Sequence, residues 1–244
     1  MVCSVYPLSQ KPSVTEISPE EAHLKFPNLS VEAYAIDPKK SNEGRNFVLI
    51  GTSLDVVMAK REAERENSLI KKDLELDEKD LRYSYRGLSG SGKVNVLLNG
   101  KTIFIASYGY NAPIDSVGGL WALDGKWILE LIHTKKHTEN NITHTDTLGD
   151  ILNNGQSLNK AFGYDENFDF QILAGKVFYY YKVEGHIGIN YDGQHIQTGF
   201  SQIPHYVCCS AAPSNPFHFQ DMVSFLANRG EEKSYLEIGV YPYN

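Results

Sequence analysis

Two-residue turns ending in glycine recur along this chain from residue 81 onward, and each separates two runs rich in β-branched and aromatic residues. These dipeptides are Asn-Gly at 99–100, Asp-Gly at 124–125 and 192–193, Ala-Gly at 174–175 and Glu-Gly at 184–185. Such turns join antiparallel strands, because glycine reaches positive φ without steric cost. The pattern predicts a mainly β chain (α+β class) of antiparallel sheets, arranged as a sandwich, a barrel or propeller-like blades.

A weak internal repeat lies within this region. Residues 98–109, LNGKTIFIASYG, resemble residues 173–185, LAGKVFYYYKVEG, and both segments are followed by an Asp-Gly turn. The repeat indicates two related β-units, 46–132 and 168–244. Between them, residues 133–167 are polar and rich in asparagine, which predicts a long, irregular, solvated connection.

The N-terminal part of the chain has a different character. Residues 1–45 show no sustained hydrophobic period, so we expect an extended N-terminal arm with one helical turn over 19–26. A single β-rich domain is then expected over 46–244. Its one amphipathic helix is predicted near 53–72, where Leu54, Val57 and Met58 begin an apolar stripe and Thr52 or Ser53 supplies a cap.

Residues 87–94, GLSGSGKV, resemble a phosphate-binding loop in the spacing of Gly87, Gly92 and Lys93. Such a loop needs a serine or threonine after the lysine and a helix that begins there. Val94 stands at the first of these positions, and the residues that follow it are typical of a strand. We therefore interpret the segment as a hairpin turn, with no nucleotide bound.

Composition narrows the classes of partner. The formal net charge is −7, and no basic stripe is present, which disfavours a nucleic-acid partner. The sequence has no apolar run of the length that a membrane helix needs, so membrane insertion is not expected. Three cysteines, two of them adjacent, indicate reduced thiols and a cytoplasmic location, or an extracellular or lipid-anchored one if a leader has been removed. No cofactor signature is present, and the sequence does not set the oligomeric state.

The leading functional hypothesis is a non-catalytic binding module with an aromatic groove. The segment 108–127 carries aromatic rings beside amide and carboxylate groups, a combination that suits a carbohydrate or an extended peptide. The candidate ligand-binding residues are Tyr108, Tyr110, Asn111, Asp115, Trp121 and Trp127. The competing interpretation is that these rings are ordinary residues of a sheet.

The alternative hypothesis is a cysteine-dependent hydrolase or transferase. The sequence HYVCCS places His205 three residues before Cys208 and four before Cys209. A catalytic thiol needs a nearby base, and in a strand His205 and Cys209 would share a face. Two buried structural thiols explain the same pattern. A carboxylate-pair glycosidase, with Asp115 and either Glu130 or Asp169, is a further alternative that no spacing singles out.

A cluster of histidines is a candidate metal site. His133, His137 and His144 lie near Glu130 and Asp146, which are ligand types that zinc accepts. No HExxH motif is present, and the surrounding residues are not typical of a helix. We therefore predict that these histidines belong to the solvated connection and bind no metal.

Overall fold

The computed structural model describes residues 14–35, 48–49, 52–53, 81–86, 93–107, 114–206, 216–218 and 222–240. Most of these residues lie in β-strands, and the described helices are two short ones, α1 (Pro19–Lys25) and α3 (Leu158–Phe162). The predicted mainly β, antiparallel class is confirmed. Over the described ranges the sheets close into neither a barrel nor a propeller. Neither α1 nor α3 has the length and apolar character that a membrane span requires.

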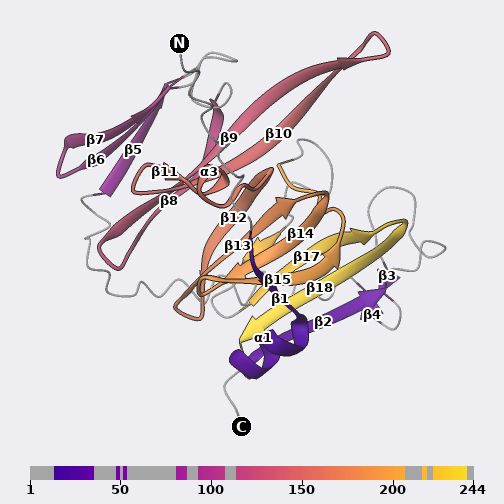
Figure 1. Cartoon of the computed structure of the whole chain (residues 1–244). Coiled ribbons are helices and arrows are strands. Elements are labelled where there is room, and N and C mark those ends of the chain that lie inside the picture. Colours follow the sequence, from indigo (N-terminus) through magenta and orange to yellow (C-terminus); the bar gives the residue numbers. More distant parts are fainter. Residues whose placement is uncertain are drawn as a thin grey trace, which may run out of the picture.

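Two sheets form the C-terminal part of the molecule (Figure 1). The five-stranded sheet has the order β1-β15-β14-β13-β12, and a four-stranded sheet has the order β16-β17-β18-β2. Their strands are β1 (Glu16–Ile17), β2 (Leu29–Ala35), β12 (Glu166–Leu173), β13 (Lys176–Val183), β14 (His186–Tyr191), β15 (Gln194–Phe200), β16 (Phe217–His218), β17 (Met222–Arg229) and β18 (Glu232–Val240). The N-terminal strands β1 and β2 thus complete the edges of sheets made from the C-terminal half. The predicted boundary at residue 46 lies outside the described residues.

Three more sheets come from the middle of the chain. A second four-stranded sheet has the order β11-β10-β9-β8, a three-stranded sheet has the order β5-β6-β7, and β3 pairs with β4. Their strands are β3 (Val48–Leu49), β4 (Thr52–Ser53), β5 (Leu81–Arg86), β6 (Lys93–Leu98), β7 (Lys101–Ala106), β8 (Ile114–Leu123), β9 (Lys126–Glu139), β10 (Ile142–Asn153) and β11 (Gln156–Ser157).

Three apolar clusters lie between successive sheets. The first joins β6 to the β8–β11 sheet through residues such as Val94 and Leu129. The second joins the opposite face of that sheet to β12 and β13, and the third joins the five-stranded sheet to β17 and β18. Because the five-stranded sheet is covered on both faces, β12 carries almost no exposed residue along its whole length.

The short N-terminal helix was predicted over 19–26 and is confirmed as α1. Ser18 accepts a hydrogen bond from the backbone amide of Glu21, and the Glu21 side chain accepts one from the amide of Ser18. Pro19 occupies the first turn, where a missing backbone donor costs nothing. Ala22 is the residue of α1 that is buried against the sheets.

The X-Gly turns behave as predicted. Asn99-Gly100, Asp124-Gly125, Ala174-Gly175, Glu184-Gly185 and Asp192-Gly193 all join paired strands, and both residues of each turn have positive φ. In the described part of the two repeat segments, 98–107 and 173–185, such a turn is followed by one strand, β7 or β13. Their origin by duplication stays a prediction.

The prediction of an irregular connection over 133–167 is wrong. Most of this stretch forms β9 and β10, a long hairpin that extends away from the other sheets (Figure 1). Polar pairs stabilise the outer part of this hairpin. The Oγ1 atoms of Thr138 and Thr143 lie 3.3 Å apart, and the stacked rings of His137 and His144 have their centroids 5.2 Å apart. Threonine is a good strand former although it is polar. Asn140 and Asn141, both at positive φ, form the turn.

Two other predictions fall largely outside the described residues. Of the helix expected near 53–72, only Ser53 is described, and it ends β4. Of the segment 87–94, Lys93 and Val94 are described, and both lie in β6. No helix therefore begins at Lys93, as the hairpin interpretation predicts.

The turn at 174 should carry measurable strain, since alanine adopts φ +50 there. Ala174→Asn should raise the free energy of unfolding by about 0.5–1 kcal/mol, because asparagine tolerates this conformation. Urea denaturation measures the change. The matched control is Asn99→Ala in the β6–β7 hairpin, which should lower stability by a similar amount. Equal stability of Ala174→Asn and the parent protein would contradict the assignment of strain.

Candidate functional site

Several predicted site residues lie outside the described part of the chain. These are Cys208 and Cys209 of the thiol hypothesis and Tyr108, Tyr110 and Asn111 of the aromatic groove. Their proposed roles stay predictions. His205, Asp115, Trp121 and Trp127 are described.

The two tryptophans do not share a surface. Trp127 is buried and packs on Phe104, with ring centroids 5.2 Å apart, in the cluster between β6 and the β8–β11 sheet. Trp121 packs on Phe170 at 4.9 Å, on the opposite face of that sheet. Asp115 is exposed on β8. The structure therefore does not bring the described members of the predicted groove together.

His205 lies in a buried polar cluster. Its Nε2 atom is 2.8 Å from Oε1 of Glu166, and its Nδ1 atom is 2.6 Å from the carbonyl oxygen of Ile203. The imidazole ring lies flat on Phe168, with centroids 3.6 Å apart. Burial alone would lower the pKa of His205, but its hydrogen bond to Glu166 and the charge of that carboxylate outweigh burial and raise the pKa.

This geometry bears on the thiol hypothesis. Both ring nitrogens of His205 face oxygen acceptors, an arrangement that suits the imidazolium form, which donates from both. In the imidazolium form both ring nitrogens carry a proton, so neither of them can accept a proton from a thiol. A catalytic role for His205 would therefore require the ring to leave Glu166 or Ile203.

A second part of the cluster centres on Glu130, which is only 3% exposed. Its Oε1 atom accepts a hydrogen bond from the amide of Asp169 at 2.8 Å, and its Oε2 atom accepts one from the amide of Phe170 at 3.0 Å. The hydroxyl of Tyr206 also donates to Oε1. Burial raises the pKa of Glu130, and the nearby charge of Asp169 raises it further. Gly118 leaves the space that this carboxylate occupies, since a Cβ there would lie 2.8 Å from its carboxyl carbon.

Asp169 and Phe170 are the two residues that the β12–β13 pairing skips, at an irregularity between Phe168 and Gln171. Asp169 has φ +62, which turns its amide toward Glu130. Its carboxylate contacts Nε2 of His218, while Oδ2 is buried without a hydrogen bond. The glycosidase alternative paired Asp115 with either Glu130 or Asp169. The structure brings Glu130 and Asp169 together and places Asp115 elsewhere.

Side-chain acceptors connect β12 to the neighbouring sheet in the same way along its length. Glu166 accepts a hydrogen bond from the amide of Gly149 at 3.0 Å, and Asn167 accepts one from the amide of Ile151 at 2.6 Å. These contacts replace the backbone partners that an edge strand lacks. The cluster thus has a structural task that accounts for its burial.

The structure separates His133 from the two other histidines of the predicted cluster. His133 is buried on β9, whereas His137 and His144 are exposed near the end of the hairpin, and His137 pairs with Asp146 at 3.0 Å. Among the residues that the structure describes, no group of three histidine, cysteine or acidic side chains is placed to hold a metal ion.

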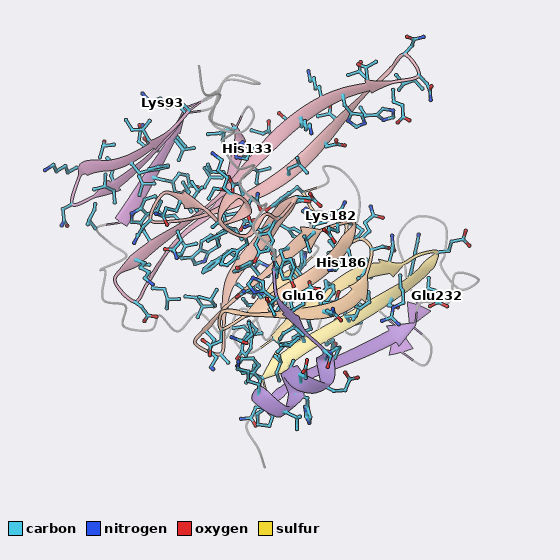
Figure 2. The ribbon with its side chains drawn as sticks, in the orientation of Figure 1. Glu16, Lys93, His133, Lys182, His186 and Glu232 are labelled. Carbon is cyan, nitrogen blue, oxygen red and sulfur yellow. The ribbon has the colours of Figure 1, made fainter. Side chains whose placement is uncertain are left out.

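A further polar group anchors the N-terminal strand. Glu16 of β1 accepts hydrogen bonds from Tyr181 at 2.6 Å, from His186 at 3.0 Å and from Gln197 at 3.3 Å, so it contacts three strands of the five-stranded sheet. Figure 2 shows Glu16 and His186 side by side on this sheet. Burial would raise the pKa of Glu16, but these hydrogen bonds and the nearby His186 outweigh it and lower the pKa.

A cavity of about 470 Å³ lies between the five-stranded sheet and β18, with α1 along one side. Most of its wall is apolar and comes from the core shared by these sheets. The lining residues are Pro19, Ala22, His23, Pro27, Leu29, Ile189, Ile196, Gln197, Thr198, Phe200, Arg229, Leu236 and Ile238. Its polar members are His23, Gln197, Thr198 and Arg229. Sequence reasoning missed this site, because its apolar residues look like any strand core.

Searches of protein-family models, of curated proteins and of solved structures find no match to this chain.

Replacing Glu130 tests the anchor that joins the two sheets. In Glu130→Gln the side-chain NH₂ group cannot accept a hydrogen bond. One of the backbone amides of Asp169 and Phe170 therefore loses its partner. We expect a loss of about 1–3 kcal/mol in the free energy of unfolding, measured by urea denaturation. The control is Glu139→Gln at the exposed end of β9, which should change stability by less than about 0.5 kcal/mol. Equal effects of the two substitutions would refute the anchor.

The His205–Glu166 pair should make stability depend on pH. Because the folded pKa of His205 is raised above its unfolded value of 6.5, its contribution is complete below pH 6.5 and is lost as pH rises through the folded pKa. His205→Gln should therefore cost about 2–4 kcal/mol at pH 6 and progressively less at higher pH. Denaturation of both proteins across pH 5.5–9 measures the difference. His144→Gln, on the exposed hairpin, should leave the profile unchanged, and a constant cost of His205→Gln across this range would contradict the ion pair.

Proposed function

We propose that this protein is a non-catalytic binding protein that holds a small, largely apolar molecule between its five-stranded sheet and β18. The observation that carries the proposal is the cavity of about 470 Å³ within the apolar core. Its wall includes Leu29, Ile189, Ile196 and Ile238, all of which are buried.

The size and chemistry of the cavity support this function. Pockets for small molecules usually measure about 300–1,000 Å³ and are mostly apolar, with a few polar groups that orient the ligand. The buried part of the wall, around Leu29, Ile189 and Ile238, offers an apolar ligand contacts that water makes poorly, because water needs two to four polar partners.

The predicted class, a non-catalytic binding module, is kept in this proposal. The proposed site is the cavity instead of the aromatic groove over 108–127. A carbohydrate needs many hydrogen-bonding groups, and this wall offers few of them. The groove around Trp121 and Trp127 has no support from the described residues, since these rings lie on opposite faces of one sheet. The cysteine-dependent enzyme stays a prediction, because Cys208 and Cys209 lie outside the described residues.

Binding of N-phenyl-1-naphthylamine, a neutral apolar fluorophore, tests the proposal. The parent protein should enhance its fluorescence with a saturable, single-site dependence. Ala22→Phe places a ring inside the cavity and should weaken this binding by about tenfold or more. Circular dichroism would verify that the variant is folded, and Ile238→Phe would fill the cavity from the opposite wall if it is not.

The matched control lies on the same helix. Leu24 is 83% exposed and is not among the lining residues, so Leu24→Phe adds a ring to α1 without entering the cavity. It should leave binding of the fluorophore unchanged. Absence of saturable binding to the parent protein, or equal weakening by Leu24→Phe, would refute the cavity as the site.

A further inference from the structure

The geometry points to Arg229 as the anchor for an anionic head group, and we infer that the cavity takes an elongated monocarboxylate with an apolar tail, such as a fatty acid. This inference rests on the proposed function and names its class of ligand. It draws on the position of Arg229, on the absence of competing acids and on the shape of the lining.

The guanidinium group of Arg229, at the end of β17, lies over an aromatic ring. Its central carbon lies 5.4 Å from the centroid of the Phe200 ring. Gly199, at φ +74, lies beside it, and a Cβ at that position would be in van der Waals contact with Nη2 of Arg229, at 3.4 Å. A guanidinium that rests on an aromatic ring loses less freedom when it binds a partner than a fully solvated one does.

Arg229 has no acidic partner within the described part of the chain. Although Glu232 is its neighbour across the β17–β18 hairpin, no ion pair joins them. None of the lining residues is an aspartate or a glutamate, in a chain that carries 30 acidic residues and a net charge of −7. The polar end of the cavity is thus a local exception to the acidic composition, which favours an anion there.

The lining runs along the strands from α1 toward this arginine. At one end, Val240 pairs with Leu29, which follows α1 closely. At the other end β18 begins with Glu232, which Figure 2 shows at the tip of the hairpin away from α1. Ile238 and Glu232 are six residues apart, which corresponds to about 20 Å of strand. A ligand that contacts both Ile238 and Arg229 is therefore elongated and apolar between them; His23, on α1, is a polar lining residue at the end away from Arg229.

The planar guanidinium group of Arg229 determines which head group of the ligand it binds best. Its parallel N–H donors match the two oxygens of a carboxylate and form charge-assisted hydrogen bonds. Gln197 and Thr198 also line the cavity, but Gln197 donates to Glu16 and the Thr198 hydroxyl donates to the carbonyl of Ile187. Arg229 is therefore the lining residue assigned to the head group. A long alkyl tail would occupy the apolar part, where each buried methylene contributes about 0.8 kcal/mol.

The test compares dodecanoate with dodecanol at pH 8 by displacement of N-phenyl-1-naphthylamine. The two ligands have the same tail and differ at the head group. The parent protein should bind dodecanoate about fivefold to tenfold more tightly than dodecanol, a preference consistent with one exposed charge-assisted contact. Arg229→Gln should abolish this preference and leave the affinity for dodecanol unchanged, which also shows that the variant is folded.

Lys233→Gln is the matched control. It removes one positive charge from the same hairpin, and Lys233 is not among the lining residues. The preference for dodecanoate should survive it. Equal loss in both variants would show a general charge effect and overturn the role of Arg229.

The remaining outcomes separate this inference from the proposed function. If dodecanol binds and dodecanoate binds no better, the cavity is a binding site and the carboxylate anchor is wrong. If dodecyl phosphate binds more tightly than dodecanoate, the assignment of a carboxylate is overturned. If neither dodecanol nor the fluorophore binds, the proposed function itself fails.

Discussion

The carboxylate of Glu130 is the interaction on which the arrangement of the sheets depends. It belongs to β9, yet it accepts backbone hydrogen bonds from two residues of β12, a strand of another sheet. An ionised carboxyl group is costly to bury, and here the amides of Asp169 and Phe170 and the hydroxyl of Tyr206 offset that cost. Glu166 and Asn167 add equivalent contacts in the opposite direction. Without these acceptors the facing edges of β12 and β10 would each present unsatisfied amides in a buried place.

Much of the fold could be predicted because hairpin turns are a local property. The sign of φ at an X-Gly pair depends on two residues, so Asn99-Gly100 and Asp192-Gly193 were recognisable without any knowledge of the rest of the chain. The same reasoning failed for β10, where threonine and histidine hide the alternation of a strand and the turn is Asn-Asn. Polarity describes exposure, and an exposed hairpin can be polar on both faces.

The candidate site could be predicted less well, because it depends on contacts between distant segments. Glu130 and Asp169 were noted as acids, but nothing in their spacing shows that the side chain of one binds the amide of the other. Likewise, Arg229 is one of many charged residues beside a turn, and its significance comes from Phe200 and Gly199 on another sheet. His205 was selected for its closeness in sequence to two cysteines, whereas its contacts with Glu166 and Phe168 come from tertiary structure.

The pairing of β2 with β18 has a consequence for biosynthesis. Residues 29–35 hydrogen-bond to residues 234–240, so β2 has no partner until the chain has been synthesised as far as β18. The wall of the cavity formed by Leu29, Leu236 and Ile238 therefore cannot assemble before β18 has left the ribosome. Until then β2 and the face of the five-stranded sheet that it helps to cover remain open to chaperones or to other chains. Completion of this core is thus late relative to the synthesis of β2, and closing a loop of this length makes it slow.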